Sequence, residues 1–331
     1  MDPRHNTLES PYHECMGKAS RIKQDPDRRA RIAAQRAAEK RKQQRNRIYI
    51  AGGSIFAVII VVVVVVLVGV NHSPSAGTAT APPTGAALTK VIDEVTSVPA
   101  SVQDQVGTGS GAVNSGSSPL ITLKGGTPLT SGGKPEVLYM GAEYCPFCAA
   151  ERWGMILAFS RFGTFTGLQP IHSAAADGAG NAEPNPNTPT WTFVNTKYTS
   201  KYVTFNTVEL DTNIPDASTG GYTTLQTPNS AESALIDKWD AAPYVPSADA
   251  GAIPFMDFGN KYMVSGASYD GSVLDGKTYQ QIATALSDPS TAIAKGAVGT
   301  ANYMTAAICQ LTNNQPATAC TPTIKALESK L

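Results

Sequence analysis

The chain has 331 residues, room for one or two domains, and its hydrophobic fraction of 42% excludes a protein without a packed core. The formal net charge of zero hides two opposite halves. Residues 1–47 hold 13 Lys and Arg against 6 Asp and Glu, whereas the remainder holds 13 against 20. This asymmetry indicates that the two parts work in different surroundings.

An unbroken apolar run occupies residues 48–70, IYIAGGSIFAVIIVVVVVVLVGV, without a charged residue. A bilayer core needs about 20 apolar residues in a helix, so we expect this run to be a transmembrane helix. Its basic flank at 28–47 and the Lys- and Arg-free flank at 71–85 predict a cytoplasmic N-terminus and an exported C-terminal part. A cleaved signal peptide is the alternative, but the run is long and begins late.

We therefore predict a single-pass protein of the cell membrane. Its chain divides into four parts. Residues 1–47 form a basic cytoplasmic tail, which we interpret as a topology signal in contact with lipid and not as a nucleic-acid-binding segment. After the helix at 48–70, residues 71–118 are a linker rich in small and polar residues that can carry a short helix. Residues 119–331 are the extracytoplasmic domain.

Strands and helices alternate in this exported part, which predicts an α/β fold. The expected strands are 121–123, 136–142, 170–176, 191–195 and 202–210, followed by a hairpin over 253–266 that turns at Gly259 and Asn260. The expected helices are 149–163, 232–239, 278–288 and 301–311.

A Cys-x-x-Cys pair, Cys145 and Cys148, falls where a strand passes into a helix. The free N–H groups and the dipole at a helix start stabilise an anion and can lower the pKa of a thiol. We assign Cys145 as the nucleophile that attacks a disulfide and Cys148 as the resolving thiol. Pro146 suits the first turn, where its missing N–H is no loss. The alternatives are half of a zinc site shared between chains and a static disulfide.

Glu143 precedes the predicted nucleophile by two positions, so in a strand both side chains point to the same side. A carboxylate there can relay protons to the resolving thiol, and we include Glu143 among the catalytic candidates. A solvated carboxylate, or one paired with Arg152, is the alternative.

The order of strand, Cys-x-x-Cys helix, intervening segment, proline-led hairpin and helix resembles the thioredoxin superfamily. The resemblance implies a three-layer sandwich with a large insertion at about 177–250. It also implies a cis peptide at Ile253-Pro254, where a strand that faces the cysteines begins and pairs with substrate. An ordinary trans proline is the alternative. We expect Ile253, Pro254, Pro146 and Phe147 to contact substrate.

A longer string, GAEYCPFCAAERWGMILAFSRFGTFTGL at 141–168, is similar to a prokaryotic family catalogued as domain of unknown function 929. The likeness covers roughly residues 88–331 and includes TFVNTKYTSKYVTFNTVEL and ICQLTNNQPATAC. That family has no settled activity, so the resemblance supports a fold more than a function.

The remaining cysteines are Cys15 in the tail and Cys309 and Cys320 near the C-terminus. We predict a structural disulfide between Cys309 and Cys320, which an oxidising compartment permits. A second redox relay to Cys145 and Cys148 is the alternative. Cys15 is expected to be a free thiol.

The predicted function is thiol–disulfide exchange on exported proteins by a membrane-anchored oxidoreductase. It needs no cofactor and no metal, but it needs a redox partner protein. The competing hypothesis is a non-catalytic binding module that keeps the same scaffold at the membrane.

Overall fold

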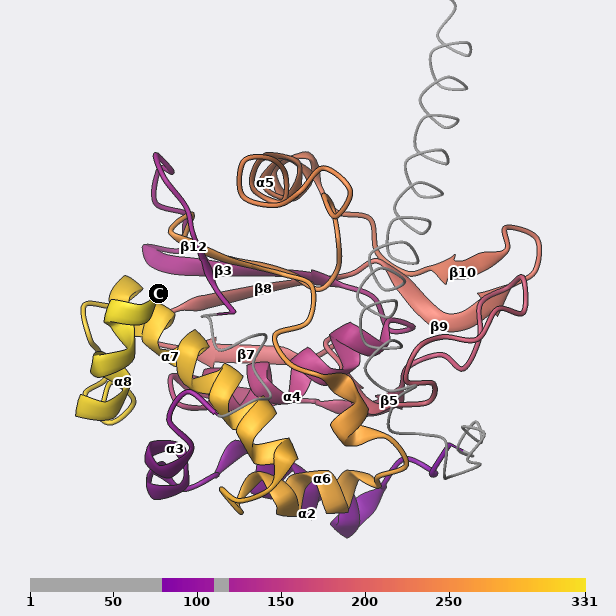
Figure 1. Cartoon of the computed structure of the whole chain (residues 1–331), viewed down its shortest axis with the longest axis horizontal. Helices are drawn as coiled ribbons and strands as arrows, with labels where there is room; N and C mark the ends of the chain where they lie inside the picture. The colour runs from indigo at the N-terminus through magenta and orange to yellow at the C-terminus, as the bar shows by residue number, and fades with distance from the viewer. Residues whose placement is uncertain (1–78, 110–118) are drawn as a thin grey trace, which may run out of the picture. The chain divides into compact units, whose positions relative to one another are not determined.

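The computed structural model describes residues 79–109 and 119–331 (Figure 1). The predicted tail at 1–47 and membrane segment at 48–70 lie outside these residues. Within them, no helix combines the length and the apolar character needed to cross a bilayer.

A mixed sheet forms the centre of the fold, in the order β1-β12-β11-β3-β2, with β8 also paired to β3. The pair of β3 and β8 is parallel, with Glu136 opposite Thr204 and Gly141 opposite Glu209, and the other pairs are antiparallel. The bounds are β1 Ile121–Thr122, β2 Thr130–Ser131, β3 Lys134–Gly141, β8 Thr204–Glu209, β11 Phe255–Phe258 and β12 Tyr262–Ser265.

The alternation of side chains along β3 separates two apolar cores. Val137 and Tyr139 belong to the larger core, whereas Leu138 and Met140 belong to a smaller one. Helix α5, Ser230–Trp239, covers the smaller core through Trp239. Helices α4, Pro146–Ser160, α6, Tyr279–Leu286, and α7, Gly299–Leu311, cover the opposite face (Figure 1). The predicted α/β class is therefore confirmed, with helices on both faces of the sheet.

The hairpin of β11 and β12 forms as predicted. Gly259 and Asn260 both have positive φ, 66° and 58°, which is the backbone that a tight hairpin turn requires. Phe258 pairs with Tyr262 across that turn. Glycine and asparagine tolerate this conformation better than other residues, which is why the dipeptide was an informative signal.

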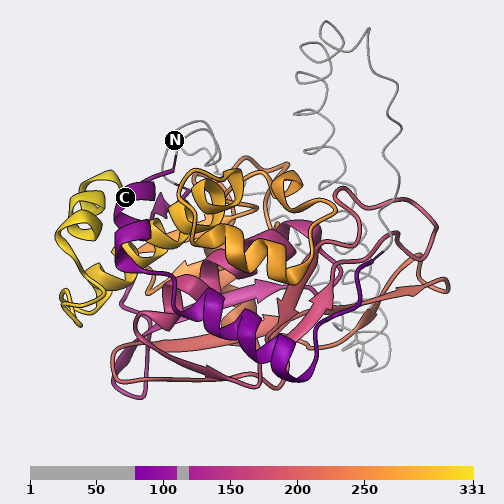
Figure 2. The same cartoon turned by 90° about the horizontal axis from the view of Figure 1, so that it is seen from below.

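Two helices precede the sheet, α2 at Gly85–Thr96 and α3 at Ala100–Val106. The larger core includes buried valines of α2 (Val91 and Val95) and of α3 (Val102 and Val106), as well as Val98 between the two helices. Figure 2 shows the indigo helix α2 on the same side of the molecule as the orange helices near the C-terminus. The short helix expected within the linker at 71–118 is present as two helices, and both pack into the domain, because their regularly spaced valines are buried there.

Three antiparallel strand pairs lie before and after strand β8 in the chain. Strands β4, Gly163–Thr166, and β7, Lys197–Ser200, enclose a second pair, β5, Gln169–His172, and β6, Pro189–Thr192. The third hairpin joins β9, Asp211–Asp216, to β10, Gly221–Thr224. The additional strands therefore begin directly after α4, earlier than the predicted insertion at 177–250. That range also contains the central strand β8 and helix α5.

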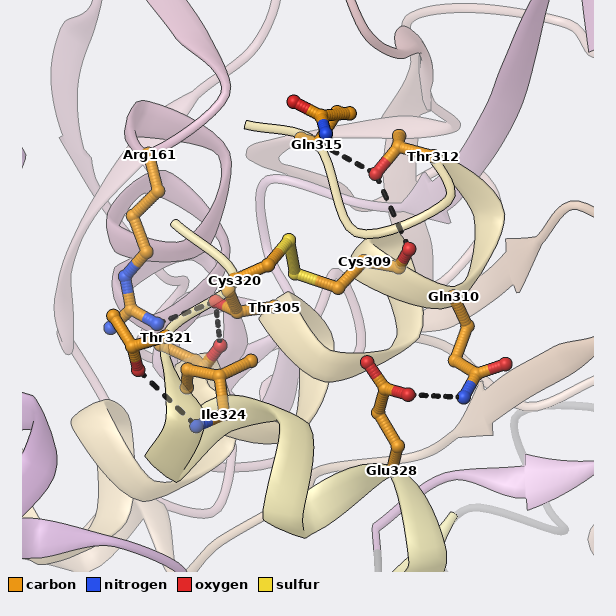
Figure 3. Close-up of a disulfide and its surroundings, with 11 residues drawn as sticks. Arg161, Thr305, Cys309, Gln310, Thr312, Gln315, Cys320, Thr321, Ile324 and Glu328 are labelled. Atoms are coloured by element: carbon orange, nitrogen blue, oxygen red, sulfur yellow. Dashed lines mark hydrogen bonds between the residues drawn. A yellow bond between two sulfur atoms is a disulfide. The ribbon is translucent and has the colours of Figure 1, made fainter. Parts of the chain in front are cut away.

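The C-terminal segment continues from α6 through a π-helical turn, η3 at Ala294–Val298, into α7 and then α8 at Pro322–Leu327. A 3-10 turn, η2, lies earlier at Gly271–Leu274, and another, η4, closes the chain at Glu328–Lys330. The disulfide of Cys309 and Cys320 is present, with both residues buried (Figure 3). It links the end of α7 to the residues before α8, so the predicted pairing is confirmed.

Candidate functional site

The two cysteines flank the start of helix α4. Cys145 is the N-cap residue, with an extended backbone, and Pro146 opens the first turn. The Cys145 Sγ accepts a hydrogen bond from the backbone N–H of Cys148 at 3.3 Å. The sulfur of the predicted nucleophile therefore accepts from one of the backbone N–H groups that have no partner within the first turn of the helix.

The predicted substrate-contact residues lie directly against this sulfur. The Ile253-Pro254 peptide is cis, as predicted. The Cys145 thiol donates to the Ile253 carbonyl oxygen at 3.9 Å, although 108 positions separate the two residues in the chain. The structure thus brings together Cys145, Cys148, Ile253 and Pro146, with Phe147 packed at the margin of the same small apolar cluster.

Burial changes the expected electrostatics of the site. Cys145 is 3% exposed and Cys148 is fully buried. Loss of solvation raises the pKa of the Cys145 thiol well above its ordinary value, and the neighbouring Cys148 thiol raises it further. The backbone N–H of Cys148 and the Arg152 guanidinium act in the opposite direction but do not prevail. The expected lowering of this pKa at the helix start is therefore wrong for the closed site described here, because desolvation outweighs the helix terminus.

Neighbours of Cys145 in the chain, together with side chains from distant segments, pack around the cysteine cluster. Tyr144, Phe147 and Leu210 are partly buried against the cysteine cluster. The ring of Tyr144 stacks on that of Tyr222 from β10, with centroids 4.0 Å apart and planes 8° apart. The Tyr222 hydroxyl in turn donates to the Glu183 carboxylate at 2.6 Å. The β9–β10 hairpin therefore supports the cover of the site through Tyr144.

The loop that carries Cys145 is held by backbone hydrogen bonds on both sides. The Glu143 N–H donates to the Asp211 carbonyl at 2.9 Å, and the Ala174 N–H donates to the Tyr144 carbonyl at 2.9 Å. These contacts fix the loop between the β9–β10 hairpin and the segment after β5. The cysteine is consequently presented from a supported turn and not from a free loop.

The proton-relay role suggested for Glu143, toward the resolving thiol Cys148, stays a prediction. In the described part of the chain, the hydrogen bonds of the Cys145 thiol engage Cys148 and Ile253, not the Glu143 carboxylate. Arg152, the alternative partner of Glu143, instead forms an ion pair with Glu209, whose Oε2 lies 2.6 Å from the Arg152 Nη2. We expected Glu143 and Cys145 to point to the same side of a strand, but β3 ends at Gly141, before both residues.

Two buried polar residues near the cysteines were not foreseen. Glu209 ends strand β8 and is fully buried with Arg152. Tyr139 is fully buried on β3, and its hydroxyl has no hydrogen-bond partner among the described residues. A glutamate at the end of an apolar strand was the available signal for the first. For the tyrosine, the sequence holds no comparable signal.

Within residues 79–109 and 119–331, no group of three or more His, Cys, Asp or Glu side chains is arranged to hold a metal ion. This finding concerns sites within one chain, and the half zinc site shared between two chains stays a separate hypothesis. Of the cysteines in these residues, Cys145 and Cys148 are free thiols. The arrangement places a dithiol next to the buried backbone carbonyl of Ile253.

A family model described as Domain of unknown function (DUF929) matches residues 123–310. No curated protein matches the chain, and no solved structure matches it. The matched range begins before β3 and ends within α7, so it includes both cysteines and the Ile253-Pro254 peptide.

Proposed function

The chain belongs to the DUF929 family, and we propose that it is a thiol–disulfide oxidoreductase that acts on exported proteins through Cys145 and Cys148. The observation that carries the proposal is the position of the Cys145 sulfur. It caps the first turn of α4 and touches the Ile253 carbonyl across the site. A dithiol in this setting has a nucleophile, a resolving thiol three residues away and a backbone acceptor for a bound peptide.

The order of the sheet supports a thioredoxin-like fold for this domain. Strand β3 leads into the cysteine-bearing helix α4, and β8 returns parallel to β3. Strands β11 and β12 follow as an antiparallel hairpin on the other side of β3, with the cis peptide immediately before β11. In this scheme the hairpins around β8 are additions that shape the substrate side.

The chemistry is an exchange of disulfides. The Cys145 thiolate attacks one sulfur of a substrate disulfide, a new S–S bond forms, and the other substrate sulfur leaves as a thiolate. Cys148 then loses its proton to solvent and attacks the Cys145 sulfur, which forms the Cys145–Cys148 disulfide and releases the substrate dithiol. The reverse sequence oxidises a substrate, and a redox partner protein resets the pair in either direction.

The Cys309–Cys320 disulfide supports an exported domain, because such bonds persist in oxidising compartments. This agrees with the proposed membrane anchor at 48–70 and with the charge asymmetry between the two halves of the chain. The proposed substrates are thus exported proteins that contain cysteine residues.

The burial of Cys145 implies that substrate has to displace part of the cover. A thiol that is 3% exposed and has a raised pKa reacts slowly with small reagents. A bound peptide that parts Tyr144 from Tyr222 would expose the sulfur and rehydrate it, which removes the main cause of the raised pKa.

The same burial favours a second candidate function, a membrane-tethered module that binds exported proteins without exchange chemistry. In that case the thiols are packing residues, and the hairpins around β8 bind a partner non-covalently. The two candidates differ in whether a covalent intermediate forms.

The test compares the full-length chain with its Cys145→Ser variant in reduction of insulin and in refolding of reduced ribonuclease. We expect the serine variant to lose the activity, since no other described thiol caps α4. Cys15→Ser is the matched control and should retain it. Equal activity of Cys145→Ser and the unmodified chain removes the proposal.

A trapping experiment separates the two candidates. Cys148→Ala removes the resolving thiol, so an oxidoreductase accumulates mixed disulfides between Cys145 and its substrates. Partners recovered only without a disulfide link favour the binding module.

A further inference from the structure

The hydroxyl of Tyr139 lies beside the sulfur of Cys148. Both atoms are within 3.1 Å of the point that a Cβ on Gly141 would occupy. Tyr139 is fully buried, and its hydroxyl lacks a hydrogen-bond partner among the described residues. Glycine at position 141 leaves open the space between hydroxyl and sulfur, which do not form a hydrogen bond with each other in the closed site. A buried hydroxyl that forgoes a partner costs stability, so its place next to a reactive sulfur calls for an explanation.

The ring of Tyr139 is held from two sides, which fixes the direction of the hydroxyl. Phe193 contacts it edge-on, with centroids 5.5 Å apart and planes at 81°. The Arg152 guanidinium lies 5.8 Å from the ring centroid and is itself anchored by Glu209. The hydroxyl therefore has little freedom to seek another partner.

We propose that Tyr139 is a positioning residue of the dithiol site, whose hydroxyl donates a hydrogen bond to the Cys148 sulfur when that sulfur becomes a thiolate. The inference rests on the proposed exchange function and specifies which step the residue assists. It stabilises Cys148 for its attack on the mixed disulfide at Cys145. It has no part in the first attack, which Cys145 makes from the N-cap position of α4.

The hydroxyl acts as a donor and not as a base. Burial raises the pKa of Tyr139 well above its ordinary value, so the hydroxyl keeps its proton through the range in which thiols ionise. The proton of Cys148 therefore leaves to water, and the hydrogen bond lowers the energy of the thiolate that remains.

The test follows the reaction of the full-length chain carrying Cys15→Ser, reduced at Cys145 and Cys148, with an excess of 5,5′-dithiobis(2-nitrobenzoate), which is the oxidant and drives the slow attack by the buried Cys145. Attack by Cys145 releases one thionitrobenzoate and leaves the second as a mixed disulfide. Attack by Cys148 then breaks that bond, forms the Cys145–Cys148 disulfide and releases the second thionitrobenzoate. Stopped-flow absorbance separates the two phases, and Cys148→Ala identifies the second by its loss.

Tyr139→Phe removes only the hydroxyl. We expect the first phase to keep its rate and the second to slow by about tenfold, with its pH midpoint shifted upward by about one unit, as loss of a hydrogen bond to a charged group predicts. Tyr198→Phe is the matched control, because it removes a hydroxyl that donates to the Phe159 carbonyl near the other end of α4.

Unchanged second-phase kinetics in Tyr139→Phe would overturn the inference, and so would equal slowing of both phases, which indicates a purely structural role. A distinct result reports on the proposed function itself. If the unmodified chain shows no second phase that depends on Cys148, exchange chemistry is absent and Tyr139 has no step to assist.

Discussion

Arg152 and Glu209 form a two-point ion pair in which both side chains are fully buried. The Arg152 Nε lies 3.1 Å from one carboxylate oxygen of Glu209, and its Nη2 lies 2.6 Å from the other. The same Nη2 donates to the Ala142 carbonyl at 2.8 Å. One guanidinium thus connects helix α4, the end of strand β8 and the loop that leads to Cys145.

Glu209→Gln keeps the shape of the side chain but leaves the Arg152 cation buried without a counter-charge. We expect the free energy of unfolding to fall by about 3–5 kcal/mol, the usual result of breaking a buried pair from one side. Urea denaturation followed by circular dichroism measures the change.

An exposed ion pair provides the control for this prediction. Lys90 and Glu94 are 3.6 Å apart on α2, and the Lys90 side chain is 63% exposed. Lys90→Gln should change the free energy of unfolding by less than about 0.5 kcal/mol. A loss of similar size in Lys90→Gln and Glu209→Gln would contradict the argument from burial.

The carboxyl of Glu151 is fully buried, and desolvation raises its pKa to about 7 even though Ser268 donates two hydrogen bonds to it. The folded state therefore binds this proton more tightly than the unfolded state, where the pKa is near 4.5. Stability is greatest below the unfolded pKa and declines as the pH rises from about 4.5 to about 7.

Glu151→Gln removes this titration. The variant should gain about 3 kcal/mol relative to the unmodified chain between acid and neutral pH, while the two proteins differ little in acid. Asp240 and Asp257 have pKa values raised to about 6 and about 7 by burial, so both proteins retain a decline from these groups. Denaturation curves across the pH range give the difference, and parallel curves would refute the prediction.

The Cys309–Cys320 disulfide closes a short loop, with a sequence separation of 11. The double variant Cys309→Ala, Cys320→Ala should lose about 3 kcal/mol of unfolding free energy, mainly through the greater freedom of its unfolded chain. Both cysteines are buried, so dithiothreitol should reduce this bond only in denaturant. Thiol counting by alkylation and mass spectrometry distinguishes the native and denatured reactions, and ready reduction of the folded protein would contradict this expectation.

Local chemistry made much of the fold predictable. The Gly259-Asn260 turn, the apolar strand at 136–142 and the cysteine-bearing helix are all specified by neighbouring residues. A short helix was expected within residues 71–118, but its packing into the core was not, because the buried valines contact helices that come two hundred residues later. The strands β4 to β7 were missed in part because each is short and pairs within its own nested hairpins.

The sequence predicted which residues of the site come together. It did not predict the properties of those residues that depend on burial. Cys145, Cys148 and Ile253 come together as expected. The raised pKa of Cys145 was not foreseen, because the cover that desolvates it includes Tyr144 stacked on Tyr222 from a separate hairpin. The roles of Tyr139 and Glu209 were likewise not foreseen, since only the folded sheet places a tyrosine hydroxyl near Cys148 and a glutamate opposite Arg152.

Because α2 begins at Gly85 and packs into the domain, residues 71–84 alone separate the folded body from the apolar run that ends at residue 70. A fully extended chain of that length reaches about 50 Å at most. With the run in a bilayer, as we propose, the short tether would keep the domain that carries Cys145 close to the lipid headgroups. Polypeptides just emerging from a translocation channel, and proteins that stay attached to the membrane, would meet it far more often than freely diffusing ones.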